Sequence, residues 1–344
     1  MIRFESDYLE GAHPRIIEKL TYTNFEQTPG YGTDIHCENA KIMIRRLCNA
    51  PEADVHFLVG GTQANTTVIA SHLRAHQGVI SPDTGHIAAH ETGAIESTGH
   101  KVLTIPNTNG KITGAQIAEY VDAHYADATH EHTVQPGMVY ISNPTELGTI
   151  YNKEELAAIS QACRAKNIPL FLDGARLGYG LMCPENDLTL ADIAGLCDVF
   201  YIGGTKVGAL FGEAVVITNP ALKQDFRYHI KQHGGMLAKG RLLGIQFEAL
   251  FEDGLYWEIS KNAVEKAIRL KKAFLEKGYE FYIDSPSNQQ FVIINDELLK
   301  EMEKKFSFSL QCHLPGGKSA VRFCTSWATT DEAIDALIDF ISRS

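Results

Sequence analysis

The stretch Val55-His56-Phe57-Leu58-Val59-Gly60-Gly61-Thr62-Gln63 joins an apolar run to two glycines and two polar residues. The β-branched and aromatic residues at 55–59 predict a buried strand, and the polar–apolar period over 63–75 predicts a helix. The glycines let the backbone turn sharply between them. A strand, a glycine turn and a helix in direct succession are typical of an α/β fold.

Apolar runs of the same kind recur farther along the chain. Segments rich in β-branched and aromatic residues, each predicted to be a buried strand, lie at 137–142, 169–173, 198–202 and 212–217. Amphipathic helical patterns separate them, such as 153–166, where Leu156, Ile159 and Cys163 share one face. Strands that alternate with helices predict a mainly parallel sheet with helices on both faces.

The pattern changes after Pro220. Long helices are predicted at 240–251 and 259–277, and apolar strands follow at 291–294 and 320–324. No internal repeat or low-complexity linker separates the two parts of the chain. We therefore predict a large α/β domain over 1–255 packed against a smaller α+β domain over 256–344.

The composition restricts the class of protein. The 344 residues include 31 Lys and Arg against 42 Asp and Glu, a formal net charge of −11 that disfavours nucleic acid as a partner. The chain has no run of about eighteen apolar residues and no signal pattern at its start, so we expect no membrane partner. Its seven cysteines show no C-x-x-C spacing, which predicts reduced thiols in the cytoplasm and no metal site.

Two predicted strands end in residues suited to chemistry. Lys206 follows the strand 198–202 among small residues, where burial would lower its pKa and free a nucleophile, although an exposed glycine-loop lysine has the same pattern. Asp173 ends the strand 169–173, three residues before Arg176. Ligands bind at the carboxyl ends of parallel strands, so Asp173 is either a partner for a cation, such as a protonated pyridine nitrogen, or a helix cap.

The turn at residues 60–63 is the third such stretch. The exposed N–H groups and the Thr62 hydroxyl at a helix N-terminus form an anion site that fits a phosphate, or else an ordinary helix cap. A phosphate cradle, a strand-end aspartate and a lysine after another strand of one sheet together predict a site for pyridoxal 5′-phosphate (PLP).

The chain resembles the fold-type I PLP enzymes, and among them the threonine aldolase and β-eliminating lyase family, in particular the low-specificity L-threonine aldolases. The resemblance rests on Ser6-Asp7, Tyr31-Gly32-Thr33-Asp34, Gly61-Thr62-Gln63-Ala64-Asn65, His86-Ile87 with Glu91 and Gly93-Ala94, Asp173-Gly174-Ala175-Arg176, and Thr205-Lys206. The string from His86 to Ala94 is the most specific, because it separates this family from plain aminotransferases.

The resemblance implies a role for each matching residue. Lys206 would carry PLP covalently, Asp173 would pair with the pyridinium nitrogen, and His86 would stack on the ring near the substrate hydroxyl, where it could act as a base. The expected cofactor-binding residues further include Gly61, Thr62, Gln63 and Arg176. The expected substrate-binding residues are Ser6, Tyr31, Arg176 and Arg322, the two arginines gripping the carboxylate, with residues 1–25 contributing to the site. Arg322 has an alternative reading as an exposed strand residue.

Two stretches depart from the family pattern. Where the family has an Asn-Thr-His-Asn-like stretch, this chain has Asn143-Pro144-Thr145-Glu146. Thr145 would then replace a second histidine, and the identity of the catalytic base stays open. The Gly234-Gly235-Met236 stretch is not followed by Arg-Gln, so the phosphate contact from a neighbouring subunit would lack its arginine. Lys231 or Lys239 is a candidate replacement.

The function that the resemblance implies is retro-aldol cleavage of L-threonine or L-allo-threonine to glycine and acetaldehyde, with a homodimer or homotetramer completing each site. A β-eliminating lyase acting on amino acids with a Cβ leaving group is the alternative within PLP chemistry. A catalytically silent PLP-binding protein is the alternative outside catalysis. The preference between L and D, or threo and allo, substrates stays open.

Overall fold

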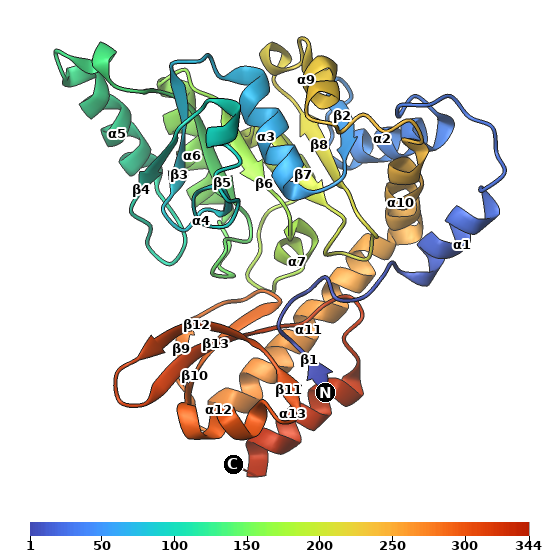
Figure 1. Ribbon diagram of the computed structural model, residues 1–344, viewed down its shortest axis with the longest axis vertical. Helices are drawn as coiled ribbons and strands as arrows, with labels where there is room; N and C mark the ends of the chain where they lie inside the picture. Colours follow the sequence, from blue (N-terminus) through green and yellow to red (C-terminus); the bar gives the residue numbers. More distant parts are fainter. Residues whose placement is uncertain (344) are drawn as a thin grey trace.

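The apolar runs of the sequence form the strands of one seven-stranded sheet in the computed structural model, which describes residues 1–343 (Figure 1). In spatial order the strands are β2 (Asp54–Leu58), β8 (Glu213–Ile217), β7 (Val199–Gly203), β6 (Leu170–Asp173), β5 (Gln135–Ser142), β3 (Gln77–Pro82) and β4 (Val102–Ile105). The strands from β7 to β4 are parallel, and β8 is antiparallel to both of its neighbours. The predicted mainly parallel sheet is confirmed.

Helices cover both faces of this sheet (Figure 1). The helices of the large domain are α1 (Pro14–Tyr22), α2 (Ile35–Leu47), α3 (Gly61–His72), α4 (His86–Ala89), α5 (Gly114–Ala126), α6 (Lys153–Ala165), α7 (Leu177–Leu181), α8 (Leu190–Leu196), α9 (Phe226–Gln232) and α10 (Arg241–Phe251), of which α1 packs against α10 away from the sheet. Helix α6 begins where the sequence predicts, because Asn152 and Glu155 form a reciprocal capping box. Across residues 1–343, every helix is too short or too polar to span a bilayer.

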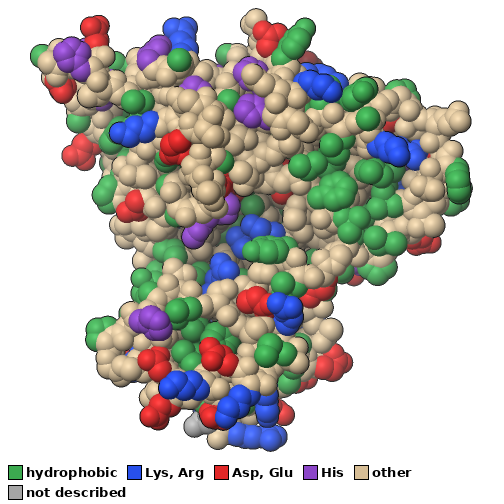
Figure 2. Space-filling view, viewed as in Figure 1, with side chains coloured by type: hydrophobic (Ala, Val, Ile, Leu, Met, Phe, Trp, Pro, Cys, Tyr) green, Lys and Arg blue, Asp and Glu red, His purple; other side chains and the backbone are tan. Residues whose placement is uncertain are grey.

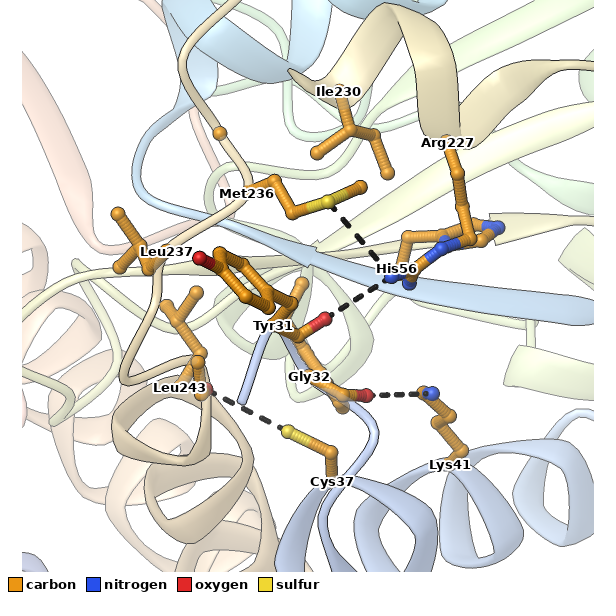
Figure 3. Close-up of a pocket in the computed structure, with 13 residues that line it drawn as sticks. Tyr31, Gly32, Cys37, Lys41, His56, Arg227, Ile230, Met236, Leu237 and Leu243 are labelled. Atoms are coloured by element: carbon orange, nitrogen blue, oxygen red, sulfur yellow. Dashed lines mark hydrogen bonds between the residues drawn. The ribbon is translucent and has the colours of Figure 1, made fainter. Parts of the chain in front are cut away.

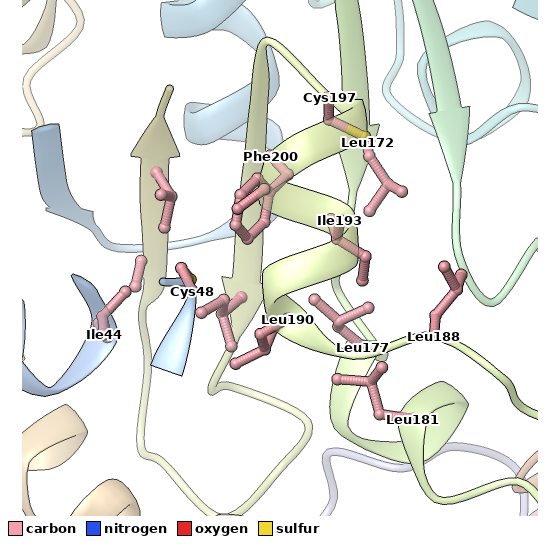
Figure 4. Packing of buried hydrophobic residues seen from close by; sticks show 14 of the residues in the cluster. Ile44, Cys48, Leu172, Leu177, Leu181, Leu188, Leu190, Ile193, Cys197 and Phe200 are labelled. Carbon is pink, nitrogen blue, oxygen red and sulfur yellow. The ribbon is translucent and has the colours of Figure 1, made fainter. Parts of the chain in front are cut away.

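Successive residues of the central strands belong to different cores. Phe200 and Ile202 of β7 pack in one cluster, with Leu177, Leu190 and Ile193 (Figure 4), whereas Tyr201 packs in the cluster on the opposite face. This alternation shows that both faces of the sheet are buried, as in doubly covered α/β folds. Replacing Phe200 with alanine would cost about 3–5 kcal/mol of stability.

The second domain is built on a four-stranded antiparallel sheet. Its strands, in spatial order, are β12 (Ser309–Leu314), β13 (Lys318–Cys324), β10 (Gln289–Asn295) and β9 (Phe281–Ile283), and its helices are α11 (Leu255–Glu276), α12 (Asp296–Met302) and α13 (Asp331–Arg343). Phe274, Val292 and Phe323 form its core with the apolar face of α13. Helix α11 runs from the large domain into this one (Figure 1), and the exact division of the chain at residues 255 and 256 stays a prediction.

The N-terminal segment joins the two domains. Strand β1 (Ile2–Arg3) pairs in parallel with β11 (Phe306–Ser307), and Phe4 is buried in the core of the small domain. The chain then passes between the domains before α1, and Asp7 accepts hydrogen bonds from Arg176 of the large domain and Asn288 of the small one. This path places the Ser6-Asp7 pair beside the carboxyl ends of the large-sheet strands.

Candidate active site

A cavity of about 330 Å³ lies at the carboxyl ends of β5, β6 and β7. Ser142, Asp173 and Lys206 line it from these three strand ends, and the Gly60-Gly61-Thr62 turn lines it from the start of α3. It opens toward the hollow between the domains, where Lys, Arg and His side chains gather (Figure 2). The position is the usual ligand-binding edge of an α/β sheet.

Asp173 is held in one orientation by three donors. Its Oδ2 accepts hydrogen bonds from the Tyr140 hydroxyl at 2.6 Å and from Asn65 Nδ2 at 3.2 Å, and its Oδ1 accepts one from the Ala175 N–H at 3.0 Å. Burial and the nearby carboxylates raise the pKa of Tyr140, so its hydroxyl stays a donor. The side chain is only 4% exposed, and a buried carboxylate of this kind is suited to a cationic partner.

Lys206 lies in a loop that glycine makes possible. A Cβ atom on Gly203, at the end of β7, would stand 2.3 Å from the Ala175 carbonyl oxygen, so only glycine fits between the two loops. Burial lowers the pKa of Lys206, and the charge of Arg176 lowers it further against the opposing effect of Asp7 and Asp173. An amine with a lowered pKa is a better nucleophile toward a carbonyl group.

The start of α3 forms an anion-binding turn. Gly60 is the N-cap and no side chain caps the helix, so the N–H groups of Gly61 and Thr62 are left for a ligand. A Cβ on Gly61 would lie 3.1 Å from the Tyr201 hydroxyl, which keeps this backbone close to the cavity wall. The Gln63 side chain accepts a hydrogen bond from the Val59 N–H and donates one to the His233 carbonyl, so the backbone N–H of Gln63 is its group best placed for an anion.

His86 is partly exposed and belongs to a chain of hydrogen-bonded polar groups that continues into the interior. Its Nδ1 lies 2.7 Å from Glu91 Oε1, and the same carboxylate oxygen accepts a hydrogen bond from Asn65, which also bonds Asp173. Burial on its own lowers the pKa of His86, but the Glu91 hydrogen bond and the charge of Asp173 raise it by more, so the net shift is upward. The ring is therefore tied to the same network as Asp173.

Arginines face the outer part of the site. Arg176 lines the inner cavity and a second one of about 560 Å³, which Arg322 of β13 also lines. Arg176 forms a two-contact ion pair with Asp7, and Arg322 donates to Gln289 Oε1 and to the Glu5 carbonyl. Ser6 lines neither cavity, although its buried hydroxyl has no hydrogen-bond partner among residues 1–343.

Tyr31 lies apart from these residues. It lines a separate cavity beside α9 with Arg227 and Met236 (Figure 3), and its carbonyl accepts a hydrogen bond from Arg227 at 3.3 Å. The Lys231 amine lies 5.2 Å from the centre of the Tyr31 ring. Within one chain, the structure therefore brings together Lys206, Asp173, His86, Gly61, Thr62, Arg176 and Arg322, but not Tyr31.

The structure adds residues that sequence reasoning did not single out. Tyr140 and Asn65 orient Asp173, while the buried carboxyl groups of Glu146 and Glu213 line the inner cavity. Burial raises the pKa of Glu213 to about 8. Thr145 turns away from both cavities, and its hydroxyl lies 2.7 Å from that of Thr149. Glu146 directly follows Thr145, the residue at the expected histidine position. A loop has no periodic pattern, so its sequence does not indicate which of the two side chains faces a cavity.

These groups fit PLP as a cofactor. The Lys206 amine suits the aldehyde, the Asp173 carboxylate suits the pyridinium nitrogen, and the open helix N-terminus suits the phosphate. The fold is that of the fold-type I PLP enzymes. Aspartate aminotransferase from Thermus thermophilus shares it with a TM-score of 0.72 over 100% of this chain and 91% of that one, at 13% identity.

Sequence comparison narrows the class to a family. The family described as Beta-eliminating lyase matches residues 4–291, and the chain belongs to this family. It is 31% identical to a low-specificity L-threonine aldolase of Pseudomonas sp., over 97% of this chain and 95% of the relative. A solved structure of threonine aldolase from Leishmania major matches with a TM-score of 0.97 and 44% identity, over 100% of this chain and 99% of that one.

Proposed function

We propose that the protein binds PLP through Lys206 and cleaves L-threonine and L-allo-threonine to glycine and acetaldehyde. The observation that carries this proposal is the convergence of Lys206, Asp173 and His86 on one cavity, beside two arginines. The relatives named threonine aldolases support the choice of substrate, since they match this chain over nearly its whole length.

Each residue has a task that its position supports. Lys206 holds the cofactor, Asp173 binds the ring nitrogen, and the N–H groups of Gly61 and Thr62 bind the phosphate. When bound, PLP supplies an electron sink for the bond that breaks at the substrate Cα. His86 would lie against the cofactor, and the hydrogen bond between its Nδ1 and Glu91 fixes the orientation of its imidazole.

Arg176 and Arg322 bind the substrate carboxylate. Both line the outer cavity, and Asp7 holds the Arg176 guanidinium by its Nε and Nη2 atoms. A carboxylate fixed at two arginines would hold the substrate Cα in one orientation toward the cofactor. A clamp that presents the Cα–Cβ bond for cleavage would favour the retro-aldol reaction over loss of the Cα proton.

The active form is a homo-oligomer, a dimer or a tetramer. Large apolar side chains are exposed on and between α1 and α2, on the side of the large domain where apolar atoms gather in Figure 2, and include Ile17, Tyr22, Phe25, Tyr31, Ile35 and Ile42. Exposed apolar patches of this kind mark association surfaces. Lys231, against the Tyr31 ring, is the candidate for the phosphate contact to a neighbouring subunit.

The cellular role that fits this reaction is threonine breakdown and glycine supply in the cytoplasm. All seven cysteines are free thiols, and six of them are buried. Reduced thiols are the rule in that compartment.

The test is acetaldehyde release by PLP-loaded protein from the four stereoisomers of threonine and allo-threonine, coupled to an aldehyde-reducing enzyme. Release from one or both L-forms is expected. If none of the four releases acetaldehyde and pyruvate forms from L-serine or a cysteine conjugate, the protein is instead a β-eliminating lyase. Silence in both assays would indicate a PLP-binding protein without catalysis.

A further inference from the structure

Glu146 occupies the junction between the two cavities of the site. It follows β5 in the loop before α6 and lines both the inner cavity with Lys206 and Asp173 and the outer cavity with Arg322. The residues common to both cavities are Tyr8, His86, Glu146, Arg176 and Lys206. A substrate whose amine reaches Lys206 and whose carboxylate reaches Arg322 has to pass this junction.

One oxygen of Glu146 is used and the other is left over. Oε1 accepts hydrogen bonds from the backbone N–H of His86 at 2.9 Å and from the Ser142 hydroxyl at 2.6 Å. Oε2 is buried and has no hydrogen-bond partner among residues 1–343. A buried carboxyl oxygen without a partner is costly, and it is expected where a ligand supplies the missing contact.

His86 is poorly suited to remove a proton. Its Nδ1 is paired with Glu91, and the hydrogen bond and the charge of Asp173 favour the protonated ring, which has no lone pair to accept a further proton. Arg176 is a permanent cation and Lys206 is assigned to the cofactor. Among the groups at the junction, the Glu146 carboxylate is the acceptor best placed to complete a hydrogen bond to a substrate hydroxyl.

We propose that Glu146 is a catalytic residue that accepts the proton of the substrate β-hydroxyl through Oε2. This inference rests on the proposed function. The hydroxyl O–H bond breaks, its proton moves to Glu146, and its electron pair becomes the second bond of the aldehyde carbonyl. The Cα–Cβ bond breaks, its pair stays on Cα, and Cα gains one proton from solvent while Glu146 returns one to solvent.

The surroundings of Glu146 set the pH at which it can act. Burial raises the pKa of Glu146 and the charge of Asp173 raises it further, while the Ser142 hydrogen bond and the charge of His86 lower it, with a net upward shift. Tyr140 and Tyr151 also lie near it. The other titratable groups that line the two cavities are Tyr8, Asp83, His90, Arg176, Tyr201, Lys206, Glu213 and Arg322. The ionised form is the acceptor, so cleavage falls as the pH drops through this pKa.

The decisive variant is Glu146→Gln, because an amide oxygen still accepts the hydrogen bonds from His86 and Ser142 while the base is lost. We expect threonine cleavage to fall about 10²–10⁴-fold in kcat. Cofactor loading, read from the absorbance of the protein and from borohydride trapping on Lys206, stays at the wild-type level. Exchange of the glycine α-hydrogen with D₂O, which involves no hydroxyl, also stays near the wild-type rate. Glu146→Asp restores part of the cleavage.

Two more variants complete the test. Ser142→Ala removes a hydrogen bond that lowers the pKa of Glu146, so the acid limb of the kcat/KM profile moves to higher pH. Thr145→Val, a neighbour facing away from the cavities, is the matched control and keeps the wild-type profile. An infrared difference spectrum, wild type minus Glu146→Gln, shows one carboxylic acid band that titrates with the same pKa as the acid limb.

Two results would overturn the role of Glu146 in removing the hydroxyl proton. One is a cleavage rate of Glu146→Gln within about twofold of wild type. The other is an equal loss of threonine cleavage and of glycine exchange in that variant. Wild-type protein that exchanges glycine but releases no acetaldehyde would instead contradict the proposed function itself.

Discussion

Asp7 and Arg176 form a buried two-contact ion pair across 169 positions of the sequence, with Nε to Oδ2 at 2.6 Å and Nη2 to Oδ1 at 3.0 Å. Asp7 also accepts a hydrogen bond from Asn288 of the small domain. One aspartate therefore joins the N-terminal segment, the loop after β6 and the small domain. It also fixes the guanidinium that is proposed to bind the substrate.

Removing the Asp7 charge should destabilise the protein strongly. In Asp7→Asn, Arg176 stays buried without its counter-ion, and breaking a buried pair in this way costs about 3–5 kcal/mol. Urea unfolding of the holoenzyme measures the loss. The matched control is Asp253→Asn, whose partner Arg15 is solvent-exposed, and its cost should stay below about 1 kcal/mol. An equal loss of unfolding free energy in the two variants would show that the buried ion pair contributes no more to stability than the exposed one.

The same pair predicts a pH dependence of stability. Burial raises the pKa of Asp7, but the charges of Arg176 and Lys206 lower it by more, so the folded-state pKa lies below the ordinary aspartate value of about 3.9. A depressed carboxyl pKa stabilises the fold above the unfolded-state value, and this contribution is lost as the pH falls through the folded-state pKa. The stability gap between wild type and Asp7→Asn should therefore narrow in acid. A gap that widens below about pH 4 would contradict the assignment.

Two variants can separate the effect of the Asp173 charge from the effect of the hydrogen bond that Tyr140 donates to it. Asp173→Asn keeps an acceptor for Tyr140 but removes the charge, and we expect cleavage to fall by at least about 10²-fold. Tyr140→Phe keeps the charge and removes one donor to it, a charge-assisted hydrogen bond worth about 1.5–3 kcal/mol, so a fall of about 10- to 10²-fold is expected. Steady-state kinetics with saturating PLP compares the two. A larger effect in Tyr140→Phe than in Asp173→Asn would exclude the proposed role of the charge.

The association surface can be tested by a single charge. Ile42→Lys places a lysine on the exposed apolar side of α2, where Ile42 is 51% exposed. The variant should dissociate into smaller species in light scattering, since an unpaired charge in an apolar interface is costly. Leu275→Lys, at the similarly exposed Leu275 of α11, is the control and should keep the wild-type mass. A wild-type protein that is already monomeric would rule out the proposed assembly.

The sequence predicts the elements of the fold whose positions depend on neighbouring residues. Strands β5 to β8 are short, dense apolar runs, and α6 carries its own capping box, so their positions follow from neighbouring residues. Strands β3 and β4 gave no clear signal, because Gln77–Pro82 mixes Gln, Gly, Ser and Pro and Val102–Ile105 has only four residues. Helix α3 ends three residues earlier than its pattern suggests, since Leu73 turns to an extended conformation.

Part of the site can also be predicted from the sequence, because some of its residues directly follow predicted strands. Lys206, Asp173 and the Gly61-Thr62 turn follow predicted strands, so their convergence at one edge of the sheet could be deduced. The contacts that orient them could not, because Asp7 and Tyr140 reach their partners only through the tertiary fold. The choice between Thr145 and Glu146 likewise depends on the path of a loop, which has no periodicity to indicate direction.

The central claim is that Lys206 and the groups around it cleave threonine. Its most direct test is the simultaneous measurement of glycine and acetaldehyde formed from L-threonine and L-allo-threonine by PLP-loaded wild type and by Lys206→Ala. The account predicts equal molar amounts of the two products from wild type and a rate lower by at least about 10³-fold for Lys206→Ala. Unequal products, or a Lys206→Ala variant as active as wild type, would contradict it.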